Sequence, residues 1–140
     1  MKMLILSLLF VFTSYGASPR SSNTIYSESE SLNFKKTDYS FLISWVEGPR
    51  TGGSRFIMKT WKKDIGTMNG PYQDLDKNLH VFLWMPSMGH GSAPVKLKKM
   101  GDGEYEVSEV QFIMRGKWEI KFQLKDGAQV FDETVIPLKI

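Results

Sequence analysis

One run of eight residues alternates so regularly between polar and apolar side chains that it predicts a β-strand. Residues Lys117–Leu124 read Lys-Trp-Glu-Ile-Lys-Phe-Gln-Leu, after Gly116 and before Asp126-Gly127. Successive side chains of a strand point to opposite faces, so the four apolar residues of this run share one face. A strand with one apolar face needs a second layer of structure to cover it.

Similar runs rich in aromatic and β-branched residues recur along the chain, separated by Gly, Pro, Asn and Asp. Asp-Gly pairs at Asp102-Gly103 and Asp126-Gly127 predict tight hairpins. No stretch has a convincing helical period, so we predict an all-β fold, an immunoglobulin-like antiparallel β-sandwich of about seven strands, with a small barrel as the alternative. The expected strands are 41–46, 55–61, 79–85, 94–100, 104–110, 117–124 and 130–140.

The beginning of the chain has the pattern of a secretory signal peptide. Lys2 provides the positive start, residues 4–12 are apolar, and Ser14 and Gly16 are the small residues of a cleavage site. The apolar run is too short to span a bilayer as a retained helix. We therefore expect residues 1–16 to be removed and the protein to be exported to the periplasm or beyond, with no retained membrane span.

The rest of the chain divides into a tail and one domain. Residues 17–38 are rich in Ser and predict a flexible tail, although Leu32–Phe34 could add to the domain as a short strand. Residues 39–140 form the predicted domain. There is no cysteine, so a disulfide, a thiolate metal site and a thiol nucleophile are excluded, and stability must come from the apolar core.

Charge further limits the classes of partner. The signal peptide contains one of the 18 basic residues, so 17 remain against 15 acidic ones, with both signs interspersed. A nucleic-acid or membrane-surface footprint would need a patch of one sign. We expect a monomer that binds an unknown protein of the cell envelope and no nucleic acid.

The loop after the third expected strand carries the candidate chemistry. Pro86 ends that strand, and Gly89 and Gly91 allow a tight turn around His90. The loop places one imidazole and the thioethers of two Met residues within six residues. This donor set suits copper, above all Cu(I), better than Mg or Ca. The alternative is packing, because Met commonly fills gaps in a core. The two Met residues of the loop are Met85 and Met88.

Two residues outside this loop also carry donor atoms. His80 begins the same strand, roughly 15–20 Å from Met85 at the rise of a strand, and is expected to be a structural or surface residue. Met68 is either a further sulfur donor or, as we expect, a packing residue of the long connection 62–78. With two His and no nucleophile motif, the sequence does not predict an enzyme.

The second half of the chain resembles the YtkA-like domain, which is related to FixH. The resemblance rests on the Met-Pro-x-Met-x-His loop of residues 85–90, a Gly-x-Tyr strand at 103–105 and a Met-x-Gly-x-Trp strand at 114–118. It spans roughly residues 54–138. It implies an immunoglobulin-like sandwich outside the cytoplasmic membrane, in a family found near copper handling, heavy-metal efflux and oxidase assembly. FixH-type members keep a membrane anchor, which we do not expect here.

The resemblance also supplies the candidate ligand set. Met85, Met88 and His90 match the family loop, and Met114 matches the Met that precedes Gly-x-Trp. These four residues are the predicted metal ligands, with copper as the metal. The alternative function is a cell-envelope interaction module without a metal, in which the same loop is a shaped corner whose sulfurs pack under aromatic rings.

Overall fold

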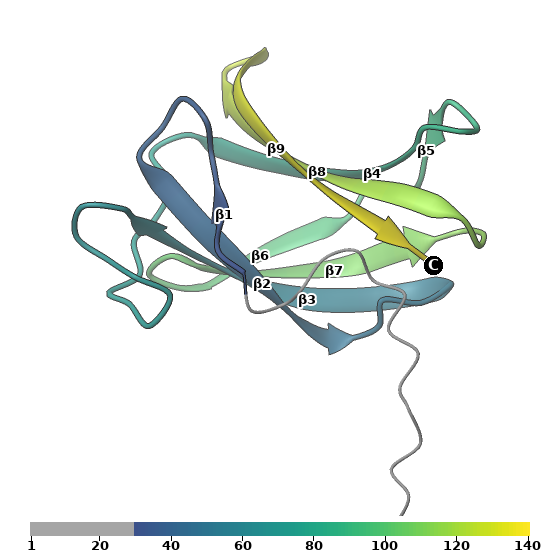
Figure 1. Ribbon diagram of the computed structural model, residues 1–140, viewed down its shortest axis with the longest axis horizontal. Coiled ribbons are helices and arrows are strands. Elements are labelled where there is room, and N and C mark those ends of the chain that lie inside the picture. The colour runs from purple at the N-terminus through teal and green to yellow at the C-terminus, as the bar shows by residue number, and fades with distance from the viewer. Residues whose placement is uncertain (1–29) are drawn as a thin grey trace, which may run out of the picture.

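The structure, a computed structural model, describes residues 30–140, so the predicted signal peptide and most of the Ser-rich tail lie outside the described residues. The described chain forms nine strands in two antiparallel sheets and no helix (Figure 1). The strands are β1 (Leu32–Asn33), β2 (Tyr39–Glu47), β3 (Gly52–Lys62), β4 (Asn78–Met85), β5 (His90–Gly91), β6 (Lys96–Gly101), β7 (Glu104–Phe112), β8 (Lys117–Asp126) and β9 (Gln129–Lys139).

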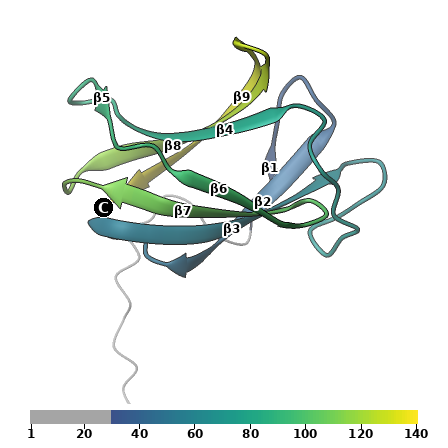
Figure 2. The same ribbon diagram turned by 180° about the vertical axis from the view of Figure 1, so that it is seen from behind.

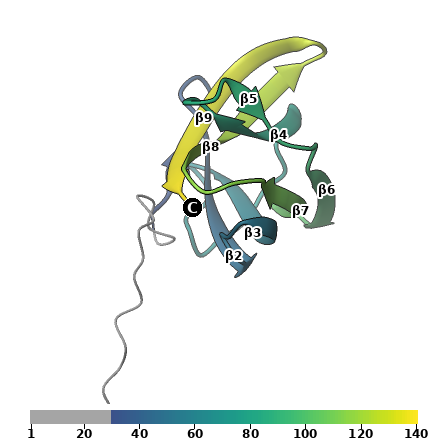
Figure 3. The same cartoon turned by 90° about the vertical axis from the view of Figure 1, so that its right-hand side faces the viewer.

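The two sheets stack face to face as the layers of a sandwich, which Figure 3 shows from one end. One sheet has the strand order β1-β2-β3-β7-β6, and the other has the order β5-β4-β8-β9. The predicted all-β sandwich is therefore confirmed. Seven of the nine strands correspond to the seven expected ones, and the additional two, β1 and β5, are only two residues long.

The alternating residues 117–124 form a strand with one buried apolar face, as predicted. Trp118, Ile120, Phe122 and Leu124 are all buried, while the polar residues between them are at least partly exposed. Strand β8 lies between β4 and β9, so its apolar side chains reach the centre of the core. The other sheet supplies the facing side chains, chiefly Phe41, Ile43, Phe56, Met58, Val107, Val110 and Phe112.

Both predicted Asp-Gly turns are present. The first connects β6 to β7. Gly103 has a φ of +64° there, a backbone conformation that residues with a Cβ rarely adopt. The second connects β8 to β9 at Gly127. These tight hairpins set the register that directs the apolar residues of each strand inward.

The segment before residue 39 joins the domain from Glu30 onward. Strand β1 pairs with the beginning of β2, as expected if Leu32–Phe34 added to the domain as a short strand. The buried carboxylate of Asp132 then accepts hydrogen bonds from the backbone N–H groups of Lys35 (3.2 Å), Lys36 (2.6 Å) and Thr37 (3.0 Å). These bonds attach the β1–β2 connection to β9 of the other sheet.

The sandwich has two ends, which the direction of β4 defines. This strand begins beside the long connection 63–77 and finishes at Met85, where the β4–β5 hairpin and the C-terminus lie (Figure 1). At strand rise, its eight residues separate the two ends by roughly 25 Å. Between Glu30 and Ile140, no helix is long and apolar enough to cross a membrane.

Candidate metal site

The predicted Met/His loop is the turn of the β4–β5 hairpin. Met85 and His90 are directly paired across the two strands. The N–H groups of Met88 (3.1 Å) and Gly89 (2.9 Å) both donate to the carbonyl oxygen of Met85, and Gly89 has a φ of +64°. The turn is thus closed by backbone hydrogen bonds, and Met88 is at its tip.

Met85 and His90 present their side chains on the same face of the hairpin, because directly opposed residues of an antiparallel pair do so. That face looks into the sandwich, since Met85 is buried and belongs to the core. The Met85 methyl lies directly over the backbone of Gly116, where a Cβ would overlap it. The loop 113–116 of the neighbouring β7–β8 connection therefore fixes the position of this thioether.

The hydrogen bond made by the His90 ring sets its tautomer. Nδ1 lies 3.0 Å from the carbonyl oxygen of Gly91, which can only accept, so the proton is on Nδ1. In the neutral imidazole, Nε2 would then keep its lone pair, the arrangement found in metal-binding imidazoles. The ring also meets the buried Trp118 indole edge to face, with 6.3 Å between the ring centroids.

Met114 is attached to the same tryptophan. The indole Nε1–H of Trp118 donates to the Met114 carbonyl oxygen at 2.9 Å. Trp118 therefore contacts both His90, through its ring, and the backbone of Met114, through its nitrogen. The Met114 side chain itself is exposed.

The four predicted ligands therefore occupy one end of the sandwich in different environments. Met85 is 4% exposed and His90 is half-buried, whereas Met114 is 38% and Met88 is 57% exposed. The inner pair is fixed by the core, and the outer two thioethers face solvent from adjacent loops. Ser92 holds this end together by donating to the carbonyl oxygen of Gln111 (2.5 Å) across the two sheets.

The two donor residues outside the loop lie away from this end of the sandwich. His80 is exposed near the start of β4, its Nδ1 is 3.4 Å from Oε1 of Gln123, and its ring lies 5.3 Å from that of Phe82. Met68 is exposed on the connection 63–77. Between residues 30 and 140, no group of three or more His, Cys, Asp or Glu side chains could hold a metal ion, so a metal here would depend on thioethers.

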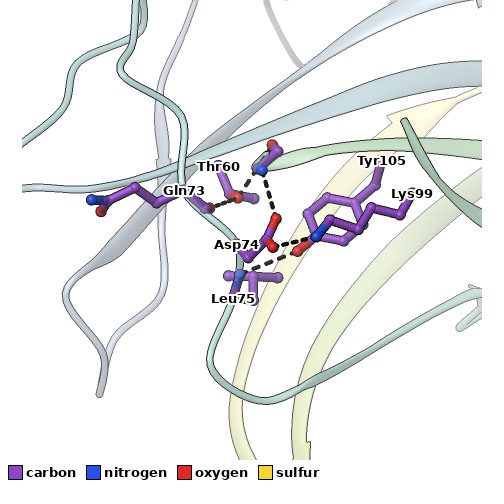
Figure 4. Close-up of polar contacts among 7 residues, drawn as sticks. Thr60, Gln73, Asp74, Leu75, Lys99 and Tyr105 are labelled. Atoms are coloured by element: carbon purple, nitrogen blue, oxygen red, sulfur yellow. Dashed lines mark hydrogen bonds and ion pairs between the residues drawn. The ribbon is translucent and has the colours of Figure 1, made fainter. Parts of the chain in front are cut away.

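The opposite end carries a polar network that the sequence patterns did not predict (Figure 4). The Asp74 carboxylate accepts a hydrogen bond from the N–H of Gly103 (2.7 Å) and pairs with Lys99. The phenol of Tyr105 accepts from the N–H of Leu75 (3.1 Å), and the Thr60 hydroxyl donates to the carbonyl oxygen of Gln73 (2.6 Å). The connection 63–77 is thereby attached to the β6–β7 hairpin.

These contacts shift the pKa values of the groups that make them. The Gly103 N–H, followed by Lys99, lowers the pKa of Asp74, and Asp74 raises the pKa of Lys99. Burial raises the pKa of the Tyr105 phenol. The sequence indicated the Asp-Gly hairpin and the Gly-x-Tyr strand at this end, but gave no indication that the distant Asp74 would bind the Gly103 N–H.

A family model described as YtkA-like matches residues 35–123, well over half of the chain. The chain belongs to the YtkA-like family. The matched region of this YtkA-like domain contains Met85, Met88, His90 and Met114. No curated protein and no solved structure matches the chain. The relation to FixH stays a prediction.

Proposed function

We propose that this YtkA-like protein is an exported copper-binding module that holds Cu(I) through Met85, Met88, His90 and Met114. The observation that carries the proposal is the cross-strand pair of Met85 and His90. This pair sets a buried thioether beside an imidazole that bonds to the backbone through Nδ1, which leaves Nε2 as the nitrogen for a metal. Thioether and imidazole are neutral, soft to borderline donors, which suit Cu(I) and not Mg or Ca.

The two kinds of donor would have different roles. Met85 and His90 are held by Gly116, by the Gly91 carbonyl and by Trp118, so they form a preorganised pair. Met88 and Met114 are on exposed loops and would complete the coordination from the solvent side. Copper would then enter from the end of the sandwich and be reachable by another envelope protein, as metal transfer requires.

The alternative is an envelope interaction module that binds no metal. The buried Met85 favours this alternative, because its thioether also has a packing role against Gly116. The exposed Met88, Ile113 and Met114 would form an adaptable apolar contact surface for a protein partner. The two functions differ in whether the imidazole and the thioethers act together on one ion.

Anaerobic titration of the mature protein with Cu(I), in competition with a colorimetric Cu(I) chelator, tests the proposal. We expect a one-to-one complex that is lost in the double variant Met88→Ala, His90→Ala. The matched control is Met100→Ala, His80→Ala, which removes the same two residue types from exposed positions away from the candidate site. Circular dichroism would verify that each variant is folded.

The two functions predict different results in this experiment. Copper binding through the hairpin requires that the control variant keep the one-to-one complex. Equal affinity in all three proteins, or no complex beyond that of an exposed histidine, would contradict the proposal and favour the interaction module.

A further inference from the structure

The sheet edges of this sandwich are protected unequally. Edge strands expose unpaired N–H and C=O groups, and proteins protect them with Lys, Pro, bulges or short strands. Strand β6 carries Lys96, Lys98 and Lys99 and a register shift, and β9 carries Pro137. Strand β2 is covered at its start by β1 and is bulged between Trp45 and Glu47.

Strand β4 has such protection only at its end, where β5 pairs with it. Within residues 30–140, β5 pairs only with Trp84 and Met85, so no strand pairs with Asn78–Leu83 on the side away from β8. That stretch has no Lys, Pro or Gly, and its pairing with β8 has no register shift. It is the longest unprotected edge in the described part of the chain.

The contact between Leu83 and Gly91 shows which backbone groups of β4 point at the open edge. The Leu83 carbonyl oxygen lies 2.9 Å from the position of a Cβ on Gly91, so it points toward the β5 side. Backbone groups of successive residues in a strand point to alternate sides. Leu79 and Val81 therefore direct their N–H and C=O groups at the open edge, and His80 and Phe82 direct theirs at β8.

Side chains around this edge are suited to an added strand. The outward face of β4 presents three rings, from His80, Phe82 and Trp84, the first of them exposed. Below the edge, the neighbouring edge strand of the other sheet is β6, and both lie on the same side of the sandwich (Figures 2 and 3). Leu97 of β6 pairs with the buried Val107, yet it remains 39% exposed.

We propose that the open edge of β4 binds an extended, acidic segment of a partner protein as an additional strand. Apolar side chains on one face of that segment would cover Leu97, and its backbone would pair with Leu79 and Val81. The charge of β6 favours a negative segment chiefly through Lys98, because Lys96 pairs with Glu109 and Lys99 with Asp74. A second copy of this chain is disfavoured, because pairing two β4 edges would also bring two Lys-rich β6 edges together.

Amide exchange measured by NMR on the full chain, with and without a probe peptide, tests this proposal. The probe is an eight-residue peptide that alternates valine and threonine and has glutamate at each end. In the free protein, the amides of Leu79 and Val81 should exchange rapidly and those of His80 and Phe82 slowly. At saturating peptide, the Leu79 and Val81 amides should slow by at least about tenfold.

Matched peptides and variants make the test specific. N-methylation of the valines, which would pair with Leu79 and Val81, should abolish the effect, and N-methylation of the threonines should not. Phe82→Glu should weaken binding, because it removes a ring and places a negative charge beside the acidic probe, whereas Val135→Glu should not. Val135 shares the cross-strand row of Phe82 and Lys121 but lies on β9, away from the edge.

Three results would overturn the proposal. Slow exchange of Leu79 and Val81 in the dilute free protein would mean that the chain already covers its own edge. Slow exchange only at high concentration would assign the edge to a second copy. Equal effects of the two N-methylated peptides would exclude strand addition.

Discussion

The two ends of this YtkA-like sandwich differ in how their loops are held. At the Asp74 end, side chains bind the backbone of a neighbouring loop through Asp74, Thr60 and Tyr105. At the Met/His end, the loops carry exposed thioethers, and only the inner pair Met85 and His90 is fixed by the core. At the Asp74 end, the polar side chains hold the connecting loops in one conformation.

This difference indicates which end of the sandwich has groups available to bind a ligand. Donors and acceptors that already pair within the molecule have little capacity left for a ligand, whereas exposed thioethers and an imidazole that bonds to the backbone through Nδ1 alone retain theirs. Trp118 connects the fixed and the free parts of the Met/His end, because it is buried and also contacts His90 and Met114. We therefore expect substitutions at the two ends to separate stability from copper binding.

The largest effect should come from removing the connection between the core and the Met/His end. Trp118→Ala would empty a fully buried position and should lower the free energy of unfolding by about 3–5 kcal/mol. Trp118→Phe keeps an aromatic ring but loses the N–H donated to Met114, and should cost less. Urea denaturation of both variants checks this order, and equal losses would contradict it.

A smaller effect is expected where a loop backbone touches Met85. Gly116 has a φ of +144°, and a Cβ there would overlap the Met85 methyl. Gly116→Ala should cost about 1–3 kcal/mol and also weaken Cu(I) binding, because the thioether must move. Gly127→Ala is the control, since its φ is +59° but no atom lies within 4 Å of the added Cβ. If the control weakened copper binding equally, displacement of Met85 would not be the cause.

At the opposite end, loss of one hydrogen bond should affect stability alone. Tyr105→Phe leaves the N–H of Leu75 without its acceptor and should cost about 1 kcal/mol. The Cu(I) affinity should be unchanged, because β4 separates this residue from the hairpin by roughly 25 Å. Denaturation and copper titration of the same sample test both statements. A weaker copper complex would show that the two ends are coupled.

The smallest effect concerns the charge of Asp74. Its pKa is lowered in the fold from the ordinary 3.8, so its contribution is present above that pH and is lost as the pH falls through the folded value. Because the pair is exposed, Asp74→Asn should cost less than about 1 kcal/mol at neutral pH. Unfolding free energies of wild type and variant should converge below pH 3.8. A constant difference at all pH values would contradict this assignment.

Much of the fold could be predicted because residue alternation directly specifies strands. The run from Trp118 to Leu124 is buried as its pattern indicates, and the two Asp-Gly turns occur where expected. Strand β1 was predicted only as an alternative at Leu32–Phe34, and β5 was not predicted, since two residues have no measurable alternation. Their pairing depends on neighbours that the sequence brings close only after folding.

The candidate site was predictable as a location but not as a geometry. The Met-Pro-x-Met-x-His pattern placed Met85, Met88 and His90 in one turn, which the hairpin confirms. Which thioether is buried depends on strand register and on the backbone of Gly116, a residue distant in sequence. The attachment of Met114 to Trp118 through its carbonyl likewise arises from the conformation of the loop and not from residue type.

X-ray absorption at the copper edge of the Cu(I)-loaded mature protein tests the central claim most directly. The account predicts sulfur and nitrogen scatterers around the same copper ion, with the nitrogen signal lost in His90→Ala and the sulfur signal reduced in Met88→Ala. A spectrum with nitrogen and oxygen neighbours only, or one that neither substitution changes, would contradict a site built from thioethers and the His90 imidazole.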